Sequence, residues 1–89
     1  MRRFSVVLSE KALKTFSKMD RYTKKIIFSW IENNLEGCEN PRLHGKALTA
    51  NVSGLWRYRI GDYRLICKIE DEILIITAVN VGHRRKIYE

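Results

Sequence analysis

The sequence predicts an α+β domain in which an N-terminal strand and a two-helix hairpin pack on a small, mainly antiparallel sheet. Two observations support this fold class. Apolar residues recur at helical spacing in the first third of the chain, and after residue 54 short runs of β-branched and aromatic residues are separated by turn residues. With 89 residues, the chain is expected to form one domain over residues 1–89, with one modest core.

The first part of the chain is expected to form a strand followed by two helices. Residues 3–8 have the composition of a strand. Ser9 is a candidate N-cap for a first helix, and Asp20 is a candidate N-cap for a second helix that stops near Gly37. The second helix is predicted from apolar residues at helical spacing: Tyr22, Ile26, Ile27, Trp30, Ile31 and Leu35.

The remainder of the chain is expected to form a long loop and a three-stranded meander. Residues 38–53 contain the only proline and little periodicity, which indicates a loop. Three strands are predicted over 55–60, 63–70 and 73–81. Residues 73–79 are apolar on both faces, so the last strand is expected in the middle of the sheet.

The composition limits the classes of molecule that could be the partner. Seventeen Lys and Arg against ten Asp and Glu give a formal charge of +7. Such a field attracts polyanions, so nucleic acid, an acidic protein or an anionic membrane could each be the partner. No apolar run approaches the roughly 20 residues that span a bilayer, and the N-terminal residues do not resemble a signal peptide. We therefore expect a cytoplasmic protein without a membrane partner.

Metal and cofactor chemistry is not expected from the sequence. Cys38 and Cys67, with His44 and His83, do not have the spacing of a zinc site. No phosphate-cradling glycine motif and no carboxylate cluster for metal-assisted hydrolysis occurs. Cys67 lies in an apolar strand segment and is expected to be a small buried hydrophobe.

The hairpin around Gly61-Asp62 is the segment most indicative of function. If these two residues form the loop, Arg59 lies opposite Arg64, and Arg57 shares their face. Like charges directly opposite across two strands are destabilising, so an anion such as a phosphate is expected between them. The alternative is a solvated basic face that is partly neutralised by nearby glutamates, Glu70 or Glu72.

The C-terminal segment adds further candidate residues. His83 could accept or donate a proton near neutral pH, although a histidine after a glycine is more often a turn residue. Tyr88 could stack on a base, or it could pack on the sheet as an ordinary aromatic residue. Basic residues lie between them: Arg84, Arg85 and Lys86.

Three segments resemble, in this order, motifs of the RelE/ParE superfamily of toxins from bacterial type II toxin-antitoxin systems. They are RLHGKAL over 42–48, GLWRYRIGDYR over 54–64 and VGHRRKIY over 81–88. The resemblance covers nearly the whole chain and points to the RelE-like branch. It implies a RelE-like fold and an mRNA endoribonuclease that acts in the ribosomal decoding site without a metal, by attack of the ribose 2′-hydroxyl on the adjacent phosphate. It also implies neutralisation by a cognate antitoxin.

The resemblance assigns roles by position. Arg64 matches the arginine that holds the scissile phosphate, Arg84 matches the arginine that assists the leaving group, and Tyr88 matches the aromatic residue that stacks on a base. His83 stands where some relatives have another basic residue. The resemblance implies a catalytic set of Arg59, Arg64, His83, Arg84 and Tyr88, together with RNA contacts from Lys46, Arg57, Arg85 and Lys86.

One departure from the family pattern affects the mechanism. Relatives often have lysines where this chain has Arg57 and Arg59, and arginine essentially never gives up its proton in a protein. Either His83 accepts the proton of the 2′-hydroxyl, or catalysis is mainly electrostatic with water as the acceptor.

Other functions remain open from the sequence. A ParE-type protein would bind and poison DNA gyrase without cleaving RNA, although such proteins generally lack the full basic and aromatic set. A non-catalytic nucleic-acid-binding module, or a toxin whose activity has decayed, would also account for the basic charge. The feature that distinguishes the endoribonuclease hypothesis is the combination of six residues predicted on one surface: Arg57, Arg59, Arg64, His83, Arg84 and Tyr88.

Overall fold

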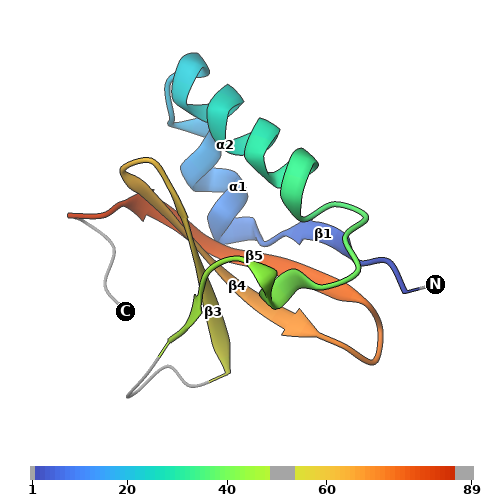
Figure 1. Ribbon diagram of the computed structural model, residues 1–89. Helices are drawn as coiled ribbons and strands as arrows, with labels where there is room; N and C mark the ends of the chain where they lie inside the picture. The colour runs from blue at the N-terminus through green and yellow to red at the C-terminus, as the bar shows by residue number, and fades with distance from the viewer. Residues whose placement is uncertain (1, 49–53, 86–89) are drawn as a thin grey trace.

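The computed structural model describes residues 2–48 and 54–85. The elements follow in the order β1 (Ser5–Leu8), α1 (Glu10–Ser17), α2 (Arg21–Asn34), a 3₁₀ turn η1 (Pro41–Leu43), β2 (Lys46–Ala47), β3 (Leu55–Ile60), β4 (Tyr63–Glu70) and β5 (Ile75–His83). The strands form one sheet in the order β1-β5-β4-β3-β2, with both helices on the same side of it (Figure 1). The predicted α+β fold class is confirmed.

The sheet is antiparallel except at one edge. β1 runs parallel to β5, and β5, β4, β3 and β2 pair in antiparallel fashion. β5 therefore has a neighbour on each side, which confirms the central position predicted from its apolar sequence. A parallel pair needs a crossover connection, and here α1 and α2 lie within the long connection that leads from β1 to the rest of the sheet.

Both helices begin at the predicted capping residues. The Oγ atom of Ser9 accepts a hydrogen bond from the Ala12 N–H at 3.1 Å, and a carboxylate oxygen of Asp20 accepts one from the Thr23 N–H at 3.0 Å. Each cap satisfies one of the N–H groups that has no partner inside its helix. Gly37 follows α2 with a φ of 76°, a conformation that glycine adopts without steric cost.

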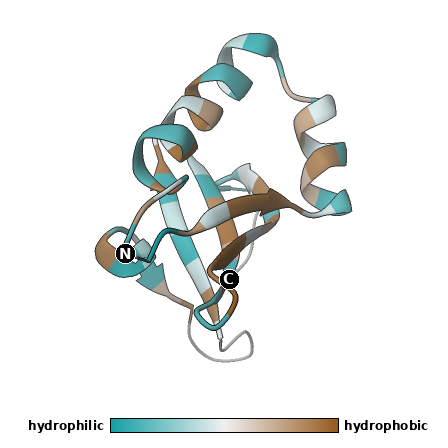
Figure 2. Cartoon of the chain, turned by 90° about the vertical axis from the view of Figure 1, so that its right-hand side faces the viewer, coloured by the Kyte–Doolittle hydropathy of each residue, from teal (hydrophilic) through white to brown (hydrophobic). Residues whose placement is uncertain are grey.

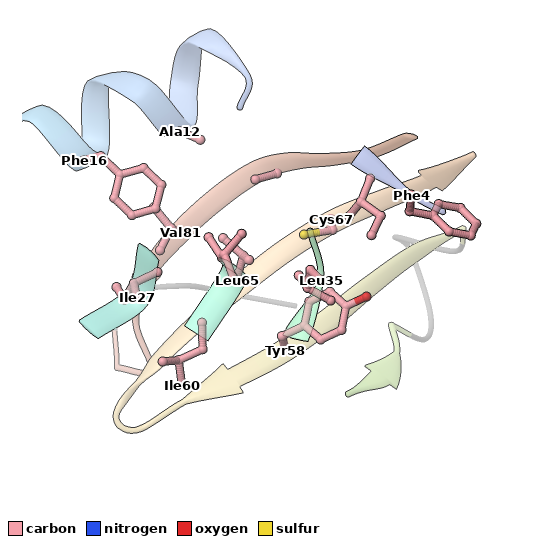
Figure 3. Packing of buried hydrophobic residues seen from close by; sticks show 13 residues of the cluster. Phe4, Ala12, Phe16, Ile27, Leu35, Tyr58, Ile60, Leu65, Cys67 and Val81 are labelled. Carbon is pink, nitrogen blue, oxygen red and sulfur yellow. The ribbon is translucent and has the colours of Figure 1, made fainter. Parts of the chain in front are cut away.

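The core lies between the helices and one face of the sheet. Both helices show hydrophobic and hydrophilic segments in alternation along their length (Figure 2), as amphipathic helices do. Phe16 of α1 and Val81 of β5 face each other within this layer (Figure 3). The rings of Phe16 and Phe28 stack with their centroids 4.6 Å apart. Cys67 is fully buried, as predicted, and burial raises the pKa of its thiol to about 12.

Two predicted boundaries are wrong. The segment expected to be one long loop contains η1 and the two-residue strand β2, which neither periodicity nor length could reveal. The last strand begins at Ile75 rather than at residue 73 and extends to His83 rather than ending at residue 81. Its start is displaced because Leu74 takes a positive φ of 56°, which belongs to a turn and not to a strand.

Candidate functional site

The hairpin of β3 and β4 places two arginines across from each other. Ile60 pairs with Tyr63 around the two-residue loop, where Gly61 has a φ of 60°, as a tight hairpin loop requires. Arg59 therefore stands directly opposite Arg64. The register predicted for this hairpin is confirmed, because the loop length fixes the pairing of all residues that follow.

Basic side chains of β2, β3 and β4 project from the sheet face that points away from the helices. Arg57 and Arg59 alternate along β3 with core residues, and Lys46 of β2 pairs with Arg57. We call this set the cationic face: Lys46, Arg57, Arg59 and Arg64. Lys46 and Arg59 are exposed, whereas Arg57 and Arg64 are half-buried, and the Nε atom of Arg64 is shielded from solvent. A partly buried guanidinium is screened less by water and attracts an anion more strongly.

The carboxylates considered as neutralising partners lie far from the Arg59–Arg64 pair. Glu70 pairs with Ile75 at the opposite end of β4 from Arg64. Six residues of strand separate the two side chains, which corresponds to about 20 Å. Glu72 lies beyond it in the turn. This separation is about twice the distance over which salt screens charges, so neither glutamate offsets the repulsion between the two arginines.

The cationic face is interrupted by a small apolar cluster. Leu48 and Ile66 are buried there, and Leu55 and Val79 pack against them. Ile66 pairs with Arg57, so the cluster borders the cationic face directly. The sequence predicts a simply cationic side of the sheet, and the buried Leu48 was not expected because it lies in the segment assigned to a loop. The cluster gives the basic side chains a fixed apolar support.

Arg84 lies at the hairpin end of the cationic face. Its backbone N–H donates to the carbonyl oxygen of Asp62 at 2.8 Å, and its Nε atom is 3.8 Å from an Asp62 carboxylate oxygen. Both side chains are well exposed, so this ion pair contributes little to stability and leaves Arg84 available. On β5 the residue opposite Arg64 is Gly82, which has no side chain. The end of β5 lies beside the loop of the β3–β4 hairpin (Figure 1). The Arg84–Asp62 hydrogen bond thus brings Arg84 to the hairpin that carries Arg64.

His83 does not share the cationic face, so the prediction that it does is wrong. It pairs with Tyr63, a residue on the helix side of the sheet, and the two rings meet edge to face at 5.4 Å. His83 lines a cleft of about 400 Å³ with Thr15 of α1 and with Lys18, which follows that helix. Because β5 extends to His83, side-chain alternation directs this residue to the side opposite Arg64. Its Nδ1 atom accepts a hydrogen bond from the Arg85 N–H at 3.2 Å.

The segment before β2 is fastened to β3 by two aromatic side chains. The Tyr58 hydroxyl donates to the Pro41 carbonyl oxygen at 2.6 Å, and burial raises the pKa of this phenol, which keeps the donor protonated. The Trp56 Nε1–H donates to the His44 carbonyl oxygen at 2.7 Å. Gly45 has a φ of 81°, and a Cβ there would collide with the Arg57 carbonyl oxygen. This segment therefore holds a fixed place beside β3.

A cleft of about 360 Å³ opens at the edge of β3, beside the start of β2. We call it the edge cleft, and it is lined by Trp30, His44, Gly45, Lys46, Arg57 and Arg59. Trp30 comes from α2 and was predicted only as a core residue of that helix. No signal in the sequence could place it here, because its position depends on how α2 crosses the edge of the sheet.

Several predicted site residues remain untested by the geometry. Arg85 is exposed next to His83. Lys86 and Tyr88 lie outside the described residues, so their predicted roles stay predictions.

Over residues 2–48 and 54–85, no group of three or more His, Cys, Asp or Glu side chains is arranged to hold a metal ion. No helix in these same ranges has the length and apolar character needed to cross a membrane.

Comparison with known families connects this geometry to a class of protein. Residues 6–88 match the family model described as ParE toxin of type II toxin-antitoxin system, parDE. The chain belongs to the ParE toxin family. This confirms the RelE/ParE superfamily predicted from the three motif segments, and the protein is a toxin of a toxin-antitoxin system. No curated protein sequence matches the toxin.

Several solved structures with a similar fold carry the RelE name. The toxin is similar to a chain of the toxin-antitoxin complex RelBE2 from Mycobacterium tuberculosis, with a TM-score of 0.84, 25% identity and 94% of each chain covered. It is similar to the isolated E. coli RelE toxin, with a TM-score of 0.69, 18% identity, and 90% of this chain and 83% of that chain covered. The YoeB dimer from Staphylococcus aureus gives a TM-score of 0.60 and 21% identity, with 91% and 97% covered. The RelE-like fold is thus shown.

The three motif segments of the toxin converge on the β3–β4 hairpin. The first is joined to the hairpin through the Pro41 carbonyl, just before the motif, and through the His44 carbonyl within it. The third reaches the hairpin loop through the Arg84–Asp62 backbone hydrogen bond. Basic residues far apart in the sequence are therefore gathered around one pair, Arg59 and Arg64.

Proposed function

We propose that this toxin is an endoribonuclease that cleaves mRNA in the ribosomal decoding site without a metal ion and so inhibits translation in the cytoplasm. The observation that carries the proposal is the opposition of Arg59 and Arg64 on adjacent strands. Two like charges at this position cost stability, and a phosphate seated between them removes the repulsion. We therefore expect the pair of arginines to be more stable with an RNA phosphate bound between them than without one.

The proposed chemistry is a transfer within the RNA chain. The 2′-oxygen of a ribose attacks the adjacent phosphorus, the bond from phosphorus to the 5′-oxygen breaks, and a cyclic phosphate and a free 5′-hydroxyl result. Negative charge grows on the phosphate oxygens during this step, and Arg64 with Arg59 would stabilise it. Arg84, at the hairpin end of the cationic face, would assist the departing 5′-oxygen.

The position of His83 bears on the proton acceptor. Its ring lies on the helix side of the sheet against Tyr63, whereas the phosphate would lie on the opposite side. This arrangement supports the electrostatic alternative, in which the arginines orient and stabilise the reacting groups and water takes the 2′-hydroxyl proton. We propose Tyr88 as the residue that stacks on a base near the reacting phosphate.

The other basic residues would guide and hold the RNA. We propose that Lys46 and Arg57 of the cationic face contact neighbouring phosphates, and that Arg85 and Lys86 extend this contact beyond β5. The formal charge of +7 would speed the encounter with the ribosomal small subunit and its mRNA. Binding should weaken as salt rises, because each neutralised phosphate releases counterions.

A cognate antitoxin is the proposed protein partner. The similar chain of M. tuberculosis comes from a toxin-antitoxin complex. An acidic segment laid over the cationic face would block phosphate entry while satisfying the opposed arginines. A complex that leaves the cationic face open and the C-terminal segment undisturbed would contradict this part of the proposal.

The test compares two targets directly. Purified toxin is added to a translating extract and to a DNA gyrase supercoiling reaction, with an Arg64→Ala variant beside it. We expect intact mRNA to be lost from the extract with the parental toxin and to remain with the Arg64→Ala variant. We expect DNA supercoiling to be unchanged.

Gyrase inhibition is the second candidate, because the family model that matches the chain carries the ParE name. Inhibited supercoiling with intact mRNA would establish it in place of RNA cleavage.

A further inference from the structure

We propose that the edge cleft binds a nucleobase of single-stranded RNA through the face of Trp30. The inference rests on the proposed function in one respect, since it takes RNA to be the substrate. It adds a base-recognition site beside the Arg59–Arg64 pair and gives a role to a helix residue that the family resemblance does not assign.

The edge cleft combines two chemically different walls. One is aromatic and is formed by Trp30 of α2 with His44, whose ring meets that of Trp30 edge to face at 5.7 Å. The other is cationic and is formed by Lys46, Arg57 and Arg59. A nucleotide combines a flat π surface with a phosphate, so both walls would be used by one ligand.

The cleft is held in shape before any ligand arrives. The Trp30 ring lies 5.4 Å from the ring of Tyr58, which is fully buried, so Trp30 is supported from the core side. The opposite end is fixed by the hydrogen bond from Trp56 to the His44 carbonyl and by the close approach of Gly45 to β3. A pre-formed platform loses little conformational freedom on binding.

Arg59 connects the cleft to the proposed reaction. It lines the edge cleft and also stands opposite Arg64. A phosphate held by these arginines would therefore place a neighbouring base at the mouth of the cleft. The volume of about 360 Å³ lies within the roughly 300–1,000 Å³ range of small-ligand sites, which suits one base rather than a folded element.

An acidic peptide is the main competing occupant. It would satisfy Lys46, Arg57 and Arg59 but would make no specific use of the Trp30 face. A nucleotide uses both walls, and the observations favour it for that reason.

The experiment follows binding to the edge cleft by the fluorescence of Trp30. Titration of the toxin with a short oligoadenylate is compared with the same oligomer in abasic form and with a glutamate-rich peptide. Trp56 is the only other tryptophan, so a Trp30→Phe variant shows which of the two rings gives the fluorescence change. We expect oligoadenylate to quench the parental toxin and the abasic oligomer to bind about 5-fold or more weakly, the scale of one lost stacking contact. Trp30→Phe should retain the affinity and lose the quenching, whereas Trp30→Leu should lose affinity.

The outcomes separate this inference from the proposed function. Equal affinity for intact and abasic oligomers, or quenching only by the peptide, would overturn the inference even if the toxin cleaves mRNA. Quenching that depends on the bases and on Trp30, in a toxin that leaves mRNA intact in extract, would support the cleft and overturn the proposed function. If Trp30→Leu fails to fold, base-dependent quenching of the parental toxin, together with its loss in Trp30→Phe, still decides the result.

Discussion

Arg59 of β3 and Arg64 of β4 stand directly opposite each other in the central hairpin of the sheet. This relationship should lower the stability of the ligand-free toxin. We expect Arg59→Gln to raise the free energy of unfolding by roughly 0.2–1 kcal/mol, because it removes a cross-strand repulsion. Urea denaturation at low salt measures the change.

The gain from Arg59→Gln should shrink as salt rises, since ions screen charges at the surface. Lys11→Gln, on the exposed face of α1, removes the same charge from the whole molecule and serves as the control. If Lys11→Gln raised the free energy of unfolding by as much as Arg59→Gln, the lower net charge would be the cause of the gain, and not the removal of the Arg59–Arg64 repulsion.

The position of His83 predicts a small role in catalysis. Its ring contacts Tyr63 on the helix side of the sheet, away from the cationic face. We expect His83→Ala to lower the single-turnover cleavage rate by less than about 10-fold, below the 10²–10⁴-fold contribution of a positioned acid or base. The rate should be measured across a range of pH around neutrality. Loss of a pH-dependent limb together with a large fall in rate would instead identify His83 as the proton acceptor.

The Arg42–Asp71 pair predicts an acid-dependent part of the stability. Two hydrogen bonds of 2.9 Å from Arg42 hold the pKa of the Asp71 carboxyl below its usual range. A lowered folded-state pKa contributes stability above the unfolded value of about 3.9, and this contribution is lost as pH falls through the folded-state pKa. Asp71→Asn should therefore be less stable than the parental toxin at neutral pH, and the difference should close below about pH 4.

Thermal unfolding across this pH range measures the Asp71 effect. Glu72→Gln removes the same charge one position away and is the matched control. A difference between Asp71→Asn and the parental toxin that persists unchanged at low pH would show that the ion pair is not its cause.

Tyr88 distinguishes stacking from proton transfer. If its ring stacks on a base, Tyr88→Phe should change cleavage little, while Tyr88→Ala should weaken both binding and rate, since base stacking contributes about 1–3 kcal/mol. Single-turnover assays over a range of toxin concentrations separate the two effects. If Tyr88→Phe lowered the cleavage rate as much as Tyr88→Ala, the phenolic hydroxyl would be a proton carrier.

Local chemistry in the sequence predicts a large part of this fold. The N-caps Ser9 and Asp20 and the β3–β4 register follow from contacts between residues close in the chain. The parallel pairing of β1 with β5 could not be predicted in this way, because it joins residues about seventy positions apart.

The candidate site was predictable only where it depends on the hairpin. Arg57, Arg59 and Arg64 lie on one face because a two-residue loop fixes their alternation. The side of the sheet taken by His83 depends on a bulge between β4 and β5 at Ile66 and on where β5 ends. Each of these features shifts the alternation of side chains, and neither has a local signal in the sequence.

The most direct test of the central claim is the rate at which Arg64→Ala cleaves mRNA on programmed ribosomes in a single turnover. Lys68→Ala, on the same strand, is the matched control, and circular dichroism checks that both variants fold. If Arg64 stabilises charge on the reacting phosphate, Arg64→Ala should be slower by roughly 10²-fold or more, the scale of losing one such donor, while Lys68→Ala stays near the parental rate. A folded Arg64→Ala toxin that cleaves at the parental rate would contradict the claim that the cationic face is the active site.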